Sequence, residues 1–313
     1  MKPGTLPDRV VVTGGAGFIG THTVRRLLQA GIETMVLDDF RHACPEPVPA
    51  TAKLVRAEIA NPDAHRALVE FQPQAIVHLA AQGGVTRSLK DPAADAEVNV
   101  VSTVGLLRTA VDAGCGRIVF ASSGGAIYGR ARRLPSREED RAKPLSPYGA
   151  AKLAGEGYLG MFSRTFGLRY LALRYGNVYG PFQDGTGEAG VVAITSTRLR
   201  RGLPPQVTGD GGQTRDFTFV ADIVAANLAA LISPYQGVLN IGTGRASSIT
   251  EVVSHLSQAA GFSGAPEYVP GRPGEVRSNF LNPARAQRHL GWKSEVSLEQ
   301  GLATTYQSFA QEG

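Results

Sequence analysis

The chain has 313 residues, of which 42% are hydrophobic, so it can bury a large core in one big domain or in two unequal ones. Its formal net charge is +5 and its pI about 9.3, but acidic residues interrupt the densest arginine group, at 132–141. This pattern favours a solvated loop over a nucleic-acid patch. No run approaches the roughly 18 apolar residues of a membrane span, and two cysteines, Cys44 and Cys115, favour a reduced, cytoplasmic protein. No nucleic-acid partner, membrane partner or metal site is predicted.

The first predicted strand, at 10–12, leads into three glycines spaced three apart and then into a predicted helix at 21–30. Gly14 allows a tight turn after the strand. Gly17 lacks the Cβ that would hold a pyrophosphate away from the backbone, and Gly20 lets the helix pack close to the sheet. The start of the helix offers free N–H groups and a partial positive charge to the phosphates. This context favours a dinucleotide site over a purely structural turn.

The second predicted strand, at 33–37, is followed by Asp38, which lies 18 residues after Gly20. At that distance an acid is expected to hold the ribose hydroxyls of NAD. The third predicted strand, at 53–57, brings the residues after it to the sheet edge where an adenine would lie. We therefore expect further cofactor contacts from the neighbours of these elements: Phe18, Ile19, Asp39, Glu58 and Ile59.

Strand and helix patterns alternate up to about residue 175. Apolar runs typical of buried parallel strands stand at 75–79, 117–121 and 171–175. Helices are predicted at 62–71, at 95–113 and after Ser146, which caps a helix with Pro147 at its first position. This alternation predicts an α/β fold with a doubly wound parallel sheet, the Rossmann arrangement.

Small residues follow the fourth predicted strand, at the sheet edge where ligands bind, so Leu79, Ala80 and Ala81 are expected to contact the cofactor. His78 is predicted to be a packed core residue rather than a catalytic one. In the helix at 95–113, Asn99 is the polar exception and a further expected cofactor contact. The predicted apolar side of that helix consists of Val98, Val101, Val104 and Leu107.

The alternation loosens beyond residue 176, where glycine- and proline-rich segments separate short strands, at 216–220 and 238–241, and helices, at 223–233 and 298–310. We predict an NAD-binding domain at 1–175, to which parts of 215–241 return. Residues 176–313 are predicted to form mainly a smaller, interleaved substrate-binding lobe.

Tyr148 and Lys152 are four residues apart on a predicted helix, so both project from one face. A nearby ammonium and the positive nicotinamide ring of NAD⁺ favour the phenolate, which predicts a general base that works near neutral pH. Ser122 and Ser123 end the preceding strand, where a hydroxyl can join the same proton network.

These motifs together resemble the extended short-chain dehydrogenase/reductase family. Within it, the chain is similar to the NAD-dependent nucleotide-sugar epimerases and dehydratases, and most of all to the UDP-glucose 4-epimerases. The resemblance spans essentially the whole chain and rests on the glycine fingerprint and on six later segments: 122–129, 148–152, 173–181, 187–192, 209–217 and 272–275.

The resemblance implies that Tyr148 takes a proton from the sugar 4-hydroxyl while hydride moves to a permanently bound NAD, giving a transient 4-keto sugar. Lys152 would hold the ribose, and Tyr175 would also contact NAD. A homodimer is implied, through the helices at 95–113 and 147–166. The implied substrate contacts are Gln82, Gly124, Asn177, Val191, Val192, Val207, Arg215 and Arg272.

Three departures from the family pattern concern the catalytic hydroxyl, the type of reaction and the substrate. Gly124 stands where a catalytic Ser or Thr is often found, so Ser123 or Ser122 would supply the hydroxyl. Gly124 and Gly125 also replace the Asp-Glu pair of 4,6-dehydratases, which disfavours elimination. Asp184 lies in the loop where glucuronate-acting relatives carry an Arg, so a neutral hexose is favoured over a sugar acid.

The leading prediction is an NAD-dependent nucleotide-sugar 4-epimerase acting on UDP-glucose and UDP-galactose. One alternative is a nucleotide-sugar dehydrogenase, reductase or 4,6-dehydratase on the same scaffold, of which the dehydrogenase or reductase would release its cofactor. An alternative of another class is a non-catalytic NAD-binding regulator. Such a regulator would be expected to lose Tyr148 or Lys152, and this chain has both.

Overall fold

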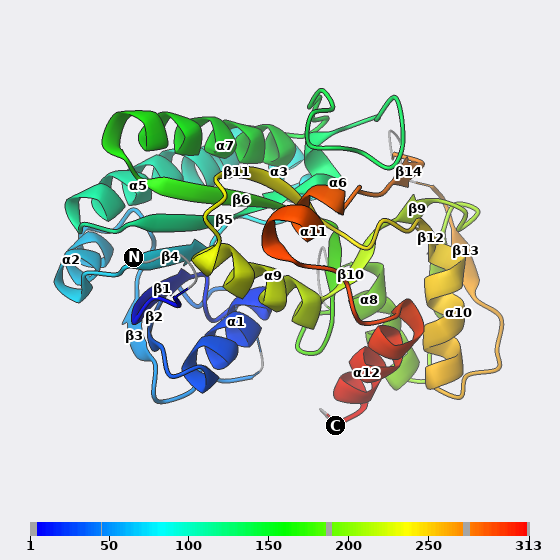
Figure 1. The fold of residues 1–313 in the computed structure, drawn as a ribbon. Helices are drawn as coiled ribbons and strands as arrows, with labels where there is room; N and C mark the ends of the chain where they lie inside the picture. The colour runs from blue at the N-terminus through cyan, green and yellow to red at the C-terminus, as the bar shows by residue number, and fades with distance from the viewer. Residues whose placement is uncertain (1–4, 45, 186–189, 272–275, 312–313) are drawn as a thin grey trace.

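A computed structural model describes residues 5–44, 46–185, 190–271 and 276–311. Its centre is a seven-stranded parallel sheet in the order β11-β6-β5-β4-β1-β2-β3 (Figure 1). The order reverses between β1 and β4, which is where ligands bind in sheets of this kind. The strands are β1 Arg9–Thr13, β2 Glu33–Asp38, β3 Lys53–Arg56, β4 Ala75–His78, β5 Arg117–Ser123, β6 Arg169–Tyr175 and β11 Gly237–Ile241. The predicted doubly wound sheet is confirmed.

Helices cover both faces of this sheet, because its strands are apolar on both sides. In β1, Val10 and Val12 pack in one core cluster with α1 (Phe18–Gln29) and α9 (Val220–Ile232). Val11 belongs to the opposite cluster, which is covered by α2 (Pro62–Phe71), α5 (Ser102–Asp112) and α7 (Pro147–Phe166). This alternation follows from the two-residue period of a strand.

The predicted helix at 95–113 is interrupted. It consists of α4 (Pro92–Ala96), a π-helical segment η1 (Glu97–Val101) and α5. The predicted apolar side is wrong at Val98 and Val101, which are 40% and 53% exposed, because positions nine residues apart, such as 98 and 107, lie on opposite sides of a helix with 3.6 residues per turn. Leu107 is buried as predicted.

The C-terminal part packs beside the sheet around a third core cluster (Figure 1). Its helices are α8 Val191–Arg200, α10 Ile249–Ala259 and α12 Leu298–Gln311. Its small sheets pair β7 Asn177–Tyr179 with β10 Phe217–Phe219, β8 Gln206–Thr208 with β13 Glu267–Val269, and β9 Thr214–Arg215 with both β12 Ser247–Ser248 and β14 Ser278–Asn279. The described residues also form three short helices: α3 Val85–Lys90, α6 Gly124–Ile127 and α11 Ala284–Leu290.

In the part of the chain that the structure describes, no helix is long and apolar enough to cross a bilayer. The division at residue 175 stays a prediction. Both α9 and β11 pack with the N-terminal sheet although they follow that position.

Candidate active site

The glycine-rich turn joins β1 to α1, and the three glycines spaced three apart stand there for different reasons. Gly14 has φ +68°, and a Cβ on it would lie 2.6 Å from the backbone nitrogen of Ala80. A Cβ on Gly20 would overlap the turn's own backbone. A Cβ on Gly17 would meet only one backbone oxygen, at 3.4 Å, so the fold itself tolerates a side chain there. No side chain caps the start of α1, so its first N–H groups remain available as donors to a ligand at the turn. The turn therefore fits a pyrophosphate.

Asp38 closes this turn at the end of β2. Its carboxylate accepts hydrogen bonds from the backbone N–H groups of Ala16, at 2.9 Å, and Phe40, at 2.7 Å. Around it, Asp39 and the exposed Glu58 are ion-paired with Arg41. Carboxylates therefore surround the adenosine side of the predicted NAD site, whereas the side chain of the predicted contact Ile59 is buried in the core cluster beneath α2 and α5.

The end of β4 is fixed by a buried histidine. His78 hydrogen bonds through Nδ1 to the Thr13 hydroxyl, at 2.6 Å, and through Nε2 to the Thr103 hydroxyl, at 3.0 Å. Burial, together with the Lys152 charge, lowers the pKa of His78 to about 3, so the ring is neutral. The predicted packed role of His78 is confirmed. Leu79, Ala80 and Ala81 follow it, half-buried, beside the glycine-rich turn.

Tyr148 and Lys152 lie one turn apart at the start of α7, which Ser146 caps by accepting from the Gly149 N–H at 3.2 Å. The Tyr148 hydroxyl and the Ser123 side chain are hydrogen-bonded. The Lys152 side chain is buried, and its ammonium lies 4.9 Å from the centre of the Phe120 ring and 5.8 Å from that of Tyr148. Three of the predicted catalytic side chains, those of Tyr148, Lys152 and Ser123, therefore meet at the carboxyl edge of β5.

Burial dominates the ionisation of this pair. It raises the pKa of Tyr148 to about 12, against the effect of the Ser123 hydrogen bond, and lowers the pKa of Lys152 to about 8. In the protein without NAD, desolvation of the phenolate therefore places the Tyr148 pKa above its ordinary value, and the effect of the Lys152 ammonium together with the NAD ring stays a prediction. Asp95 adds to the Tyr148 shift and opposes that of Lys152.

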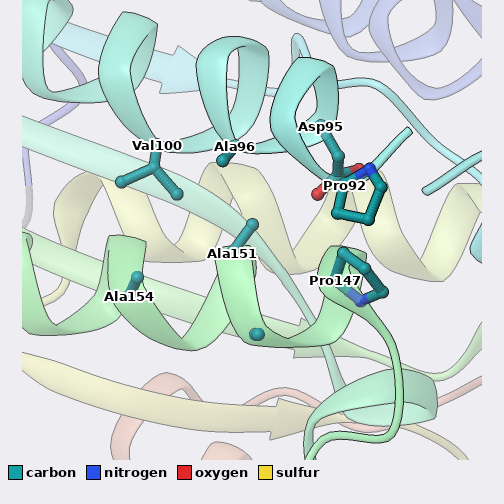
Figure 2. Close-up of a pocket in the computed structure, with 8 residues that line it drawn as sticks. Pro92, Asp95, Ala96, Val100, Pro147, Ala151 and Ala154 are labelled. Atoms are coloured by element: carbon teal, nitrogen blue, oxygen red, sulfur yellow. The ribbon is translucent and has the colours of Figure 1, made fainter. Parts of the chain in front are cut away.

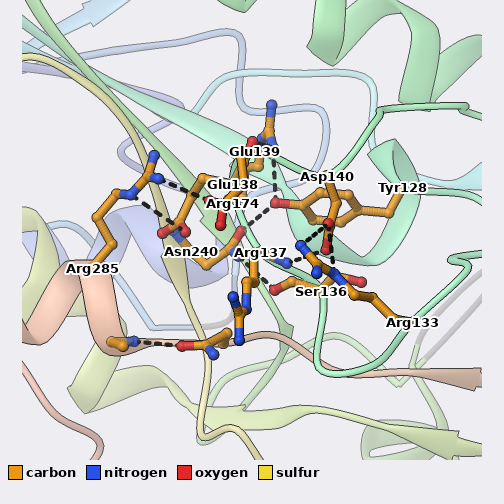
Figure 3. Close-up of polar contacts among 12 residues, drawn as sticks. Tyr128, Arg133, Ser136, Arg137, Glu138, Glu139, Asp140, Arg174, Asn240 and Arg285 are labelled. Atoms are coloured by element: carbon orange, nitrogen blue, oxygen red, sulfur yellow. Dashed lines mark hydrogen bonds and ion pairs between the residues drawn. The ribbon is translucent and has the colours of Figure 1, made fainter.

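The two serines at the end of β5 point to different environments. Ser122 donates to Glu156 at 2.6 Å, and Glu156 is paired with Arg174 in the protein interior. Arg174 also donates a hydrogen bond to the Tyr128 hydroxyl, at 2.8 Å, and both residues belong to the network that Figure 3 shows. Ser123, one residue later, lies on the Tyr148 side. Of the two predicted hydroxyls, the structure therefore brings only that of Ser123 to Tyr148.

Glycine at position 124 has a packing cause. A Cβ there would lie 2.5 Å from the side chain of Leu281, which occupies the space that a larger residue would need. Gly125 is exposed, and a Cβ on it would lie 3.5 Å from Asn177 Oδ1 and 3.8 Å from Ser123 Oγ. The predicted substrate residue Asn177 thus borders the same space as the predicted catalytic hydroxyl.

The remaining predicted site residues are placed less uniformly. Arg215 is half-buried on β9, and Tyr175 donates its buried hydroxyl to Asn227 at 2.6 Å. The side chains of Val192 and Val207 are buried in the third core cluster, so they are not available to a ligand, whereas Val191 packs against that cluster and is half-buried. Arg272 lies outside the described residues, as do residues 187–189 of the predicted uridine segment.

Sequence reasoning missed Asp95. This buried carboxylate accepts hydrogen bonds from two predicted site residues, Gln82 at 2.9 Å and Asn99 at 3.0 Å. The available signal was its position four residues before Asn99, which places both on one side of a helix.

Comparison with known proteins agrees with the family that the sequence motifs resemble. The profile of the NAD dependent epimerase/dehydratase family matches residues 10–242. The chain belongs to this family. It is 42% identical, over 96% of its length and 98% of the relative's, to UDP-glucose 4-epimerase from Mycolicibacterium smegmatis.

Two solved structures are similar over nearly their full length. One is UDP-glucose 4-epimerase from Thermotoga maritima with UDP-glucose, with a TM-score of 0.95, 40% identity and coverage of 97% of this chain and 99% of that one. The other is UDP-glucose 4-epimerase from Thermus thermophilus in complex with NAD, with a TM-score of 0.90, 41% identity and coverage of 96% and 98%.

Proposed function

We propose that the protein is an NAD-dependent nucleotide-sugar 4-epimerase that interconverts UDP-glucose and UDP-galactose. The observation that supports this most directly is the meeting of Tyr148, Ser123 and the buried Lys152 beside a glycine-rich dinucleotide turn. The chain that carries this arrangement is about 40% identical to UDP-glucose 4-epimerases over nearly its whole length.

In this proposal Tyr148 removes the proton of the sugar 4-hydroxyl. Ser123, which is hydrogen-bonded to Tyr148, would also hydrogen bond to the sugar 4-hydroxyl and hold it in place. Lys152 binds the nicotinamide ribose and places a positive charge near the phenol. When bound, NAD supplies the hydride acceptor and a positively charged ring that favours the phenolate. The residues that would hold it are the glycine-rich turn, Asp38 and the segment after β4, with Glu58, Ile59 and Asn99 further contacts.

Inverting C4 requires the keto sugar to turn while the nucleotide stays fixed. Asn177 and Arg215 are suited to holding the diphosphate, and Arg272 is proposed as a second arginine, since guanidinium groups bind oxyanions in a forked geometry. The exposed Asp184 would repel a sugar carboxylate, which supports a neutral hexose. Gly124 and Gly125 offer no acid or base for elimination, so a dehydratase is the weaker alternative.

We also propose a homodimer formed through α4, η1, α5 and α7. Exposed apolar side chains gather on these helices, among them Val98, Val101, Tyr158 and Phe166. A shallow groove of about 270 Å³ runs between α4, η1 and α7, lined mainly by proline, alanine and valine (Figure 2). A second copy would cover this face, as the family resemblance also implies. A cytoplasmic location is proposed because Cys44 and Cys115 are both free thiols.

The decisive experiment is an NMR time course of the purified protein with UDP-glucose and no added cofactor. Appearance of UDP-galactose is expected, and Tyr148→Phe should abolish it. Adding NAD⁺ and a panel of UDP- and dTDP-sugars tests the alternatives. Net release of NADH would replace the proposal with a dehydrogenase, and no turnover of any sugar would favour the regulator.

A further inference from the structure

Asp95 is a buried carboxylate that the proposed reaction does not use. It lies on α4, is 1% exposed, and one of its oxygens accepts from Gln82 Nε2, at 2.9 Å, and from Asn99 Nδ2, at 3.0 Å. Its other oxygen is buried and has no hydrogen-bond partner among the described residues. A buried carboxylate is costly unless it is paired, so its position calls for a compensating function.

The first consequence concerns the two amides. An ionised carboxylate only accepts hydrogen bonds, so both amides must turn their N–H groups toward Asp95. Asn99 Oδ1 is then free to accept from the Gln82 backbone N–H, at 2.9 Å, and Gln82 Oε1 is left as a buried acceptor. Asp95 therefore determines which way two predicted ligand-binding side chains face.

The second consequence is electrostatic. Helix α4 packs against α7, and Asp95 lines the groove between them together with Ala151, the residue before Lys152. Burial raises the pKa of Asp95 itself, while the Asn99 hydrogen bond and the Lys152 charge lower it, so the carboxylate and the ammonium favour each other's charged forms. Among the described residues, the neutral His78 on β4 also feels the Lys152 charge, and the Tyr148 ring on α7 lies 5.8 Å from the ammonium. Asp95 raises the pKa of Lys152 against the larger effect of burial, which brings it down to about 8.

We propose that Asp95 is a positioning residue of the reaction centre, whose carboxylate fixes the direction of the Gln82 and Asn99 amides and serves as the counter-charge of Lys152. The role assigned to Lys152 rests on the proposed function. The interaction between the two charges does not, so it can be tested without turnover.

The test uses protein labelled with ¹³C-lysine. The chain has only six lysines, so the Cε signal of Lys152 can be assigned with Lys152→Met and followed against pH. Asp95→Asn keeps the shape and removes the charge, and it should move the Lys152 midpoint down by about one pH unit. The control is Asp91→Asn, because Asp91 is the exposed N-cap of the same helix, and asparagine also caps. If Asp95→Asn does not fold, Asp95→Ser serves instead.

A midpoint that does not move in Asp95→Asn, or that moves equally in Asp91→Asn, would overturn the proposal. Kinetics then separate positioning from a merely structural role. In Asp95→Asn the alkaline limb of the kcat–pH profile should shift to lower pH by the same amount as the Lys152 midpoint. A shifted midpoint with unchanged kcat at every pH would overturn the positioning role. If the wild-type protein itself epimerised no sugar, the proposed function would fail, while the NMR result would stand.

Discussion

The Glu156–Arg174 pair behind Ser122 is expected to be the most sensitive point of the polar interior. Glu156 accepts from Arg174 Nε at 2.9 Å, from Arg174 Nη2 at 2.6 Å and from Ser122 Oγ at 2.6 Å. Both charged side chains are 6% exposed. Glu156→Gln keeps the shape but leaves the guanidinium buried without its counter-charge, which should lower the free energy of unfolding by about 3–5 kcal/mol.

Comparison variants isolate the cause. Ser122→Ala removes one hydrogen bond and should cost only about 1 kcal/mol. Glu156→Leu combined with Arg174→Met removes both charges, so it should recover most of the loss. Asp112→Asn breaks the exposed pair of Asp112 with Arg108 and should have no measurable effect.

The assay is urea unfolding followed by circular dichroism, with the midpoint and slope fitted for each variant. Equal losses for Glu156→Gln and Ser122→Ala would refute the reasoning, because they would assign the effect to the hydrogen bond rather than to the unpaired charge. A double variant less stable than Glu156→Gln would refute it as well.

Three further predictions concern the site and the surface. Gly20→Ala should unfold the protein because its Cβ would overlap the turn's backbone, whereas Gly17→Ala should stay folded but lose bound NAD, as measured by cofactor content after purification. Lys152→Met should raise the free energy of unfolding by about 3 kcal/mol at pH 7, because burial lowers the Lys152 pKa from 10.5 to about 8 and the unfolded chain holds the proton more tightly. Because the folded-state pKa lies below the unfolded one, the wild type should become as stable as the variant as the pH rises from 8 to 10.5. A stability difference between wild type and variant that stays constant in urea titrations across that range would contradict this prediction. Val98→Glu with Val101→Glu should convert a dimer to a monomer in light scattering, and an unchanged mass would exclude this face as the interface.

The sheet was predictable because its signals are local. A β-branched run such as that of β1 is buried on both faces and has one structural interpretation, and the glycine turn after it has the spacing that a strand-turn-helix unit needs. The pairing of Tyr148 with Lys152 follows from helical periodicity alone.

The rest depends on contacts distant in sequence. Nothing near Ser122 indicates that Glu156, 34 residues away, would bind its hydroxyl. The strands β9, β12 and β14 have two residues each, too few for any periodicity to appear. The exposure of Val98 and Val101 depends on which side of their helix packs on the rest of the chain, and no local pattern indicated that side.

The late position of β11 has a consequence for synthesis. The N-terminal strands leave the ribosome first, but β6 finds its outer partner only when Gly237–Ile241 appears, and α9 arrives just before it. Until then the nascent chain exposes an unpaired apolar strand edge, the feature that invites aggregation. A fragment that stops at residue 175 would share this defect. The chain is therefore expected to depend on chaperones during translation until β11, the last strand of the seven-stranded sheet, has emerged.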